Sequence, residues 1–340
     1  MRTRSLLCAT FLPLALTVPA AAQMDMGHGG HGGHCPDDAV AQPILSVGDF
    51  DGSGRVSLWD IVMYAHQRHE GYEAIYDRNA DGRLDRWDIL EVIFDCGAES
   101  TEFDRQLVEL FHRYKKYRDI DAAIADGFRP FTQELAGHGF HYARMPFLVR
   151  PDGTMDPDYE NILDETVDPL EPEGLNYDEN GNLVAVFHYH GINVLDWVLA
   201  NRAGNTAAVQ ALAAQSMAMS DPTGPKPDAY ASDDEMWHTH WGPCFDGLDY
   251  VAMTFDPTIT PTFLQPLTQE ECFLTAAASQ GTSQPKLGWL PAFNMMHVRL
   301  FKLNRCGLFA GTDPDVSPDA PPEPFLQTFE EWLAKMLGGA

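Results

Sequence analysis

Two twelve-residue segments of the chain, 49–60 and 77–88, place oxygen-bearing side chains at the same five positions, 1, 3, 5, 9 and 12. This spacing suits a loop that curls round Ca²⁺, which takes about six to eight oxygen ligands. A glycine stands at position 6 of both segments, where such a loop turns sharply, and position 7 would add a backbone carbonyl. The duplication predicts two calcium sites rather than a pair of acidic turns that bind no metal. The predicted ligands are Asp49, Asp51, Ser53, Arg55, Ser57 and Asp60 in the first loop and Asp77, Asn79, Asp81, Arg83, Asp85 and Asp88 in the second.

The distance between the two loops indicates which kind of calcium module they form. Sixteen residues separate them, and at about 1.5 Å of rise per residue this is too short for two helices and a turn. One helix must therefore follow each loop. The arrangement resembles the EF-hand-type loops in the dockerin modules of cellulosomal proteins over residues 44–95. The resemblance implies a small all-α module that binds two calcium ions and a cohesin-like or other extracellular partner. It departs at loop positions 10 and 11, where many dockerins carry a Ser/Thr pair and this chain has Leu58-Trp59 and Arg86-Trp87.

The N-terminal residues predict export. Residues 1–22 combine two arginines, an apolar run and three closing alanines, which is typical of a cleaved signal peptide and of a secreted or periplasmic protein. Residues 23–34 form a His/Met/Gly-rich leader that suits copper or is a plain disordered tail. The calcium module is then expected over 35–98, the main domain over 99–316, and a Pro-rich linker with an amphipathic helix over 317–340.

Cysteine pairing is the expected state in an oxidising compartment. Cys35 and Cys96 bracket the calcium module, so a bridge between them is predicted. Cys244 with Cys272 is the second predicted pair. Cys306 is left over.

The main domain is predicted to have an α+β fold with an antiparallel sheet. Helical periodicity covers 102–118, and helices are also expected at 205–219 and 269–279. Strand-like runs with Pro/Asp/Gly-rich connections occur at 140–149, 182–191, 248–255 and 294–302. The formal net charge of −28 makes nucleic acid an improbable partner. No later apolar run reaches the length of about 18 residues that a membrane-spanning helix needs.

Four further segments carry a second resemblance: 117–127, 137–142 (GHGFHY), 173–189 (EGLNYDENGNLVAVFHY) and 295–316, which opens with MMHVRLFK. They are similar to a family of secreted proteins of unknown function, over most of residues 115–316. This chain departs from the family's pattern at Arg305-Cys306, where the family usually has proline after the asparagine. The resemblance implies no activity.

Histidines in the same domain form a candidate transition-metal site. Two H-x-H pairs occur, and alternate residues of a strand share a face, so each pair would present two imidazoles on one side. Imidazole suits copper or zinc. The structural alternative is that these rings hydrogen-bond to nearby loops. The predicted ligands are His188, His190, His238 and His240, together with His141 or His297.

Three functions fit these features, and the sequence does not decide whether the protein is an enzyme. The first is a calcium-binding secreted protein whose large domain binds copper or zinc. The second is an enzyme attached to an extracellular scaffold through its calcium module. The third is a non-catalytic adhesion or structural protein.

Overall fold

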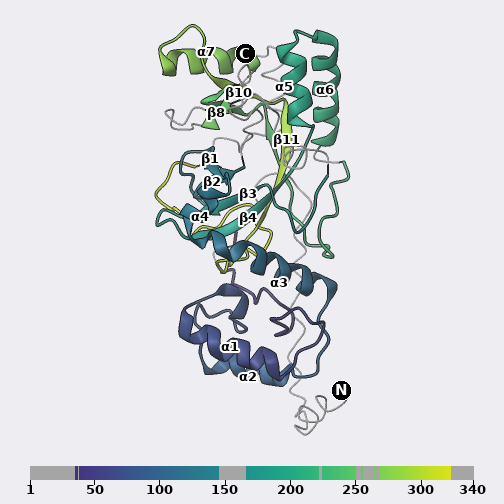
Figure 1. The fold of residues 1–340 in the computed structure, drawn as a ribbon, viewed down its shortest axis with the longest axis vertical. Coiled ribbons are helices and arrows are strands. Elements are labelled where there is room, and N and C mark those ends of the chain that lie inside the picture. The colour runs from purple at the N-terminus through teal and green to yellow at the C-terminus, as the bar shows by residue number, and fades with distance from the viewer. Residues whose placement is uncertain are drawn as a thin grey trace.

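A computed structural model describes residues 35–36, 38–144, 166–221, 224–249, 254–255, 263–264 and 268–322. The fold is α+β, as predicted, with an antiparallel sheet between two helical parts (Figure 1). The predicted signal peptide, the leader and the C-terminal helix lie outside the described residues. None of the helices in the described ranges combines the length and the apolar character needed to cross a membrane.

The segment that carries the two loops forms one end of the molecule (Figure 1). Helix α1, Leu58–Glu70, follows the first loop, and α2, Arg86–Phe94, follows the second, with the short 3₁₀ helix η2, Ala74–Tyr76, between them. Each helix begins in a capping box, formed by Ser57 with Asp60 in α1 and by Asp85 with Asp88 in α2. One helix per loop is the arrangement that the spacing predicted.

The predicted helix at 102–118 is α3, Glu102–Tyr114, continued by the 3₁₀ turn η3, Lys115–Arg118. Its apolar stripe is buried, including Leu107 and Phe111. The short helix α4, Ile120–Ala125, follows and leads into the sheet.

The main sheet has the strand order β1-β2-β3-β4-β11-β5, and every neighbouring pair is antiparallel. The strands are β1 Arg129–Pro130, β2 Phe140–Ala143, β3 Gly174–Tyr177, β4 Leu183–His190, β5 His238–Trp241 and β11 Ala292–Val298. The strands predicted at 182–191 and 294–302 thus form the centre of the sheet. The run at 248–255 instead forms the small pair β7 Leu248–Asp249 and β8 Thr254–Phe255. The strand predicted at 140–149 is present to residue 143, and its last residues lie outside the described ranges.

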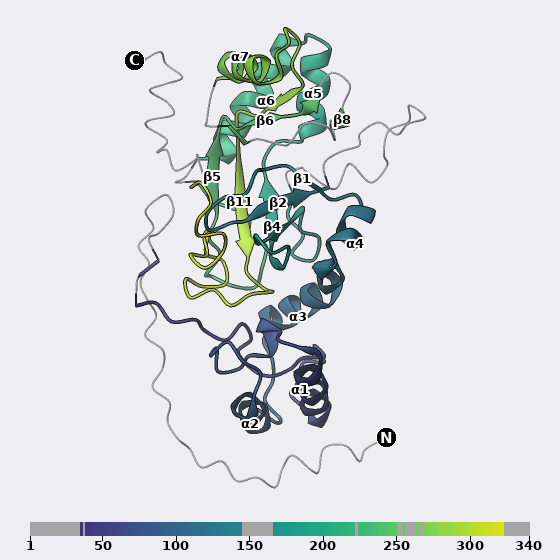
Figure 2. The ribbon, with the colours of Figure 1, turned by 90° about the vertical axis from the view of Figure 1, so that its left-hand side faces the viewer.

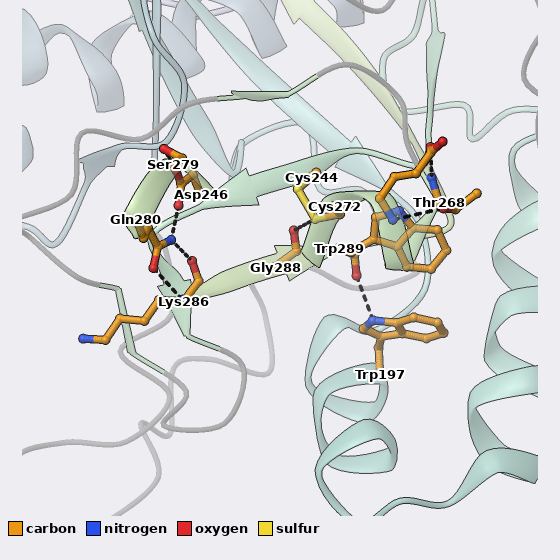
Figure 3. Close-up of a disulfide and its surroundings, with 11 residues drawn as sticks. Trp197, Cys244, Asp246, Thr268, Cys272, Ser279, Gln280, Lys286, Gly288 and Trp289 are labelled. Atoms are coloured by element: carbon orange, nitrogen blue, oxygen red, sulfur yellow. Dashed lines mark hydrogen bonds between the residues drawn. A yellow bond between two sulfur atoms is a disulfide. The ribbon is translucent and has the colours of Figure 1, made fainter. Parts of the chain in front are cut away.

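A second layer covers the far end of the sheet. Its helices are α5 Val194–Arg202, α6 Thr206–Met219 and α7 Gln269–Gln280, and its strands are β6 Cys244–Asp246, β9 Phe263–Leu264 and β10 Leu287–Trp289. The predicted bridge between Cys244 and Cys272 is present and joins β6 to α7 (Figure 3). Beside it, the indole of Trp197 in α5 donates to the carbonyl of Trp289 in β10 at 2.9 Å (Figure 3).

The predicted bridge between Cys35 and Cys96 is wrong. Cys35 is bonded to Cys306, with a Cα–Cα distance of 5.3 Å, and Cys96 is disulfide-bonded as well. The physical reason is that Cys35 lies beside Cys306 of the large domain, and the chain reaches the two-loop segment only after this point (Figure 2). Cys35 and Cys96 bracket the module in sequence, but they are not bonded to each other.

Packing is continuous from the two-loop segment into the large domain. Phe50 of the first loop lies near Tyr76, at 4.4 Å between ring centroids, Tyr76 meets Phe111 of α3 at 6.2 Å, and Phe111 meets Phe301 after β11 at 5.6 Å. All four rings belong to one buried cluster. The module and the sheet therefore share a hydrophobic core.

Candidate metal centres

The two calcium-type loops have the same backbone conformation. Position 6 has a positive φ in both, 92° at Gly54 and 80° at Gly82. Position 4 also has a positive φ, 64° at Gly52 and 54° at Ala80. Left-handed backbone at a non-glycine residue such as Ala80 is uncommon and costs about 1 kcal/mol or more. The second loop adopts a left-handed conformation at Ala80 despite this cost. We infer that closing the loop requires a positive φ at position 4.

The aspartates at positions 1 and 12 organise each loop in the same way. In the first loop, Asp60 Oδ1 accepts from the amide of Phe50 and Asp60 Oδ2 from the amide of Ser57, each at 2.8 Å. In the second loop, Asp88 accepts at the same distance from the amides of Arg78 and Asp85. The amide at position 6 donates to the position-1 aspartate in each loop, again at 2.8 Å.

These aspartates concentrate negative charge inside the protein. One carboxylate oxygen each from Asp49, Asp51 and Asp60 lie within 4.8 Å of one another. Burial raises the pKa of Asp60 and also that of Asp77, which shows that their ionised forms are under-solvated. A cation at the centre of each loop would compensate this charge, so the residues present fit calcium.

The first loop is also attached to the large domain. Ser100 Oγ donates to Asp49 Oδ2 at 2.5 Å, and His112 of α3 bonds through Nε2 to the carbonyl of Phe50 at 3.1 Å. Both backbone groups of Val56, at position 8, bond to the segment after α2, to Ala98 at 3.0 Å and to Gly97 at 2.9 Å. The backbone of Val56 therefore pairs with residues 97–98 and not with Leu84, which holds position 8 of the other loop.

The loop positions that the dockerin resemblance assigns to partner binding are exposed. Trp59 and Trp87, both at position 11, are 59% and 51% exposed. A cohesin-like partner for them stays a prediction.

Strand register decides which of the predicted histidine ligands meet. In β11, Met295 lies opposite His238 of β5 and Tyr189 of β4, whereas Met296 lies opposite His188. Directly opposite residues share a face of the sheet, and successive residues alternate. His238 and His240 therefore lie on the face of His297, and His188 and His190 lie on the other. The structure does not bring the two H-x-H pairs together.

His188 and His190 have polar contacts on their own face. The hydroxyl of Tyr230 donates to the carbonyl of Pro169, so it accepts from His188 Nε2, which lies 2.8 Å away. His188 Nδ1 lies 3.6 Å from Glu173. The side-chain amide of Asn294 donates to His190 Nδ1 at 3.2 Å. For these two residues the contacts match the structural alternative that the sequence left open.

On the opposite face, three imidazoles gather from three elements. His141 comes from β2, His297 from β11, and His138 from the turn before β2. One ring nitrogen from each lies within 4.8 Å of the others, and the ring centroids are 5.1 to 5.5 Å apart. All three side chains are buried. His238 adjoins this cluster, with its ring parallel to that of His297 at 5.3 Å, and His240 lies one step further, 4.9 Å from His238.

Two neutral side chains orient these rings. Asn176 of β3, which is fully buried, accepts from His297 Nδ1 at 3.1 Å and donates to the backbone carbonyl of His138 at 3.2 Å. Thr132 Oγ1 lies 3.1 Å from His141 Nδ1 and accepts from the amide of His141 at the same distance. Burial, and then the positive charge of Arg299, hold the pKa of His297 well below its usual range, so this imidazole is neutral.

His138 is the member of this cluster that the predicted ligand set omitted. It lies in the turn that pairs Leu135 with Gly139, so strand periodicity does not point to it. The signal was the motif GHGFH at 137–141, in which both glycines have positive φ, 80° at Gly137 and 68° at Gly139. Glycines on both sides of a histidine indicate a tight turn that displays its ring.

Comparisons of the chain with protein-family models, with curated proteins and with solved structures found no match.

Proposed function

We propose that the protein is a calcium-binding extracellular protein in which two EF-hand-type loops each hold one Ca²⁺. The observation that carries the proposal is the equivalence of the loops, which share positive φ at positions 4 and 6 and the same hydrogen bonds to the aspartates at positions 1 and 12. Hard oxygen ligands in this arrangement suit Ca²⁺. The signal-like segment at 1–22 and the disulfide bonds support export.

Within this proposal, calcium has a structural role. The first loop touches Ser100 and His112, and it carries Phe50 into the shared core. An ion that holds this loop in shape also stabilises the contact with α3. Binding free energy therefore adds to the free energy of unfolding of the whole protein.

Calcium titration of the full chain tests the proposal. We expect two ions per chain, with dissociation constants of about 10⁻⁴ to 10⁻³ M, the range of extracellular modules. Asp51→Ala should remove one ion and Asp81→Ala the other, because each deletes the position-3 or position-5 ligand of one loop. Both side chains are exposed, so neither substitution empties the core.

Glu91→Ala is the matched control, since it removes one exposed carboxylate of α2 outside the loops. It should keep both ions. The proposal would be refuted if both loop variants still bound two calcium ions, or if the control lost as much calcium affinity as they did. Either result would mean that calcium is attracted diffusely to an acidic surface.

A further inference from the structure

We propose that His138, His141 and His297 bind one divalent transition-metal ion, zinc or copper, through three imidazole nitrogens. This site is separate from the calcium loops, and its ligand set differs from the one predicted by the H-x-H pairs. The proposal rests on four observations: the convergence of the rings, their orientation by neutral partners, the contrast with His188, and the all-imidazole composition of the ligand set.

The distances suit one ion. Metal–nitrogen bonds of about 2.0 to 2.1 Å place the ligands of a tetrahedral ion roughly 3.4 Å apart. The three nitrogens already lie within 4.8 Å of one another, so closing the set needs small side-chain movements and no change of strand register.

The partners of Asn176 determine the tautomer of His297. Because Asn176 donates through its amide nitrogen to the carbonyl of His138, its oxygen is the atom that accepts from His297 Nδ1. His297 is then protonated at Nδ1 and carries a lone pair at Nε2. That nitrogen is fully buried and has no hydrogen bond within the described residues. A buried acceptor without a partner costs free energy, which a metal bond would offset.

This arrangement is typical of metal-binding histidines, in which the second ring nitrogen is fixed by a neutral or acidic neighbour. His188 shows the contrasting case in the same sheet. Its ring is just as buried, but one nitrogen faces Tyr230 and the other faces Glu173. At His188 one ring nitrogen is hydrogen-bonded and the other lies 3.6 Å from a carboxylate oxygen. A ring nitrogen of His297 instead lies within 4.8 Å of nitrogens of His138 and His141, which could share an ion with it.

The chemistry of the set selects the metal. Three neutral imidazoles suit zinc and copper, while calcium and magnesium prefer oxygen ligands. Thiolate is excluded as a fourth ligand among the described cysteines, because all of them are disulfide-bonded. Three protein ligands leave one position of a tetrahedral ion for water or a substrate atom, as in catalytic zinc sites.

Metal binding to the full chain tests the site. The background protein carries His28→Ala, His31→Ala and His34→Ala, which removes the competing histidines of the leader, and excess calcium occupies the acidic loops. Zn²⁺ is titrated against this protein, and Co²⁺ reports coordination through its visible absorption. We expect one ion per chain and the strong Co²⁺ bands of a four-coordinate site.

Two ligand variants and one matched control decide the outcome. His138→Ala and His297→Ala should each weaken Zn²⁺ binding at least about 100-fold, since even an outer partner of a ligand is worth about 10- to 100-fold. His190→Ala, which removes an H-x-H histidine from the opposite face, should bind like the background protein. If His297→Ala does not fold, His138→Ala decides the question. The His138 substitution removes a side chain from a turn, whereas the His297 substitution removes one from a strand of the sheet. No bound ion, unchanged binding in His138→Ala, or equal loss in His190→Ala would overturn the proposal.

Discussion

Glu173 is a buried carboxyl group on the face of the sheet opposite to the three-histidine cluster. Its Oε2 accepts from the amide of Tyr189 at 2.8 Å and lies 3.6 Å from His188 Nδ1. Burial raises its pKa, so between the unfolded and the folded pKa the folded state holds a proton that the unfolded chain has released. Stability linked to this proton is therefore lost as pH rises through the folded pKa.

Replacing Glu173 with glutamine should show this linkage. Glutamine keeps an oxygen for the amide of Tyr189 but does not ionise. We expect the free energy of unfolding of Glu173→Gln to improve relative to the wild type as pH rises from about 5 to about 8. Urea denaturation at the two pH values measures the difference.

Glu179→Gln provides a control of opposite sign. Hydrogen bonds from backbone amides, including that of Ser317, lower the pKa of Glu179, so its contribution is present at neutral pH and is lost on acidification. Its stability relative to the wild type should improve as pH falls below about 4.5, the range in which the unfolded chain takes up the proton, and should not vary between pH 5 and 8. A Glu173→Gln difference that does not vary with pH would mean that the carboxyl group titrates normally in the fold.

Among the connections between elements, the turn before β2 fixes the place of His138. Gly139 has φ 68°, and a Cβ at this position would lie 2.0 Å from the carbonyl oxygen of Tyr177 in β3. The carbonyl of Tyr177 is part of a paired strand and cannot rotate aside as a side chain could. A side chain at position 139 must therefore push the turn away from the sheet.

Gly139→Ala should therefore destabilise the protein by at least about 3 kcal/mol, the sum of left-handed backbone strain and overpacking. Gly204 is the matched position, since it has φ 62° but a Cβ there would meet nothing within 4 Å beyond its chain neighbours. Gly204→Ala should cost only the backbone strain of about 1 to 2 kcal/mol. Chemical denaturation of both variants checks the difference, and equal costs would contradict the close approach of turn and strand.

The sequence predicts whether a segment is a helix or a strand more readily than it predicts which elements pair with each other. The helix predicted at 205–219 and the strands at the centre of the sheet are present, because 3.6- and 2-residue periodicities report which side of an element is buried. Periodicity correctly implies that each H-x-H pair faces one way. Periodicity does not show which residue of β11 lies opposite each histidine. A shift of one residue in the strand register would move a whole H-x-H pair to the other face of the sheet.

The three-histidine cluster was partly predictable for the same reason. His141 and His297 were in the predicted set, and the structure places them together. His138 depends on a turn whose shape is fixed by contact with the backbone of Tyr177, which is distant in sequence. Long-range packing of this kind leaves no local signal beyond the paired glycines.

The core shared by the two-loop segment and the sheet predicts that the molecule unfolds cooperatively. The ring contacts from Phe50 through Tyr76 and Phe111 to Phe301 cross the junction between module and sheet. Calcium chelation should therefore lower the melting temperature of the entire protein in one transition. Each site contributes about 2.7 kcal/mol when free calcium is about 100 times its Kd.

Scanning calorimetry with calcium and with a chelator measures this effect. The far-ultraviolet signal of helices and the near-ultraviolet signal of the aromatic core should shift together. Two separate transitions, of which only the smaller responds to chelator, would show that the module unfolds independently of the sheet.

The sequence alone could not show that the predicted bridge between Cys35 and Cys96 is wrong. Two cysteines that bracket a module in sequence can still lie far apart in the folded chain. The actual bridge between Cys35 and Cys306 spans 271 residues. This span has a consequence for biosynthesis. At about 5 to 20 residues per second, a ribosome needs on the order of ten seconds to a minute to deliver the second cysteine after the first. During that interval Cys35 can meet thiols that are synthesised before Cys306, such as that of Cys96. Native pairing therefore requires either that Cys35 stays reduced or that a premature bond is exchanged through a mixed disulfide.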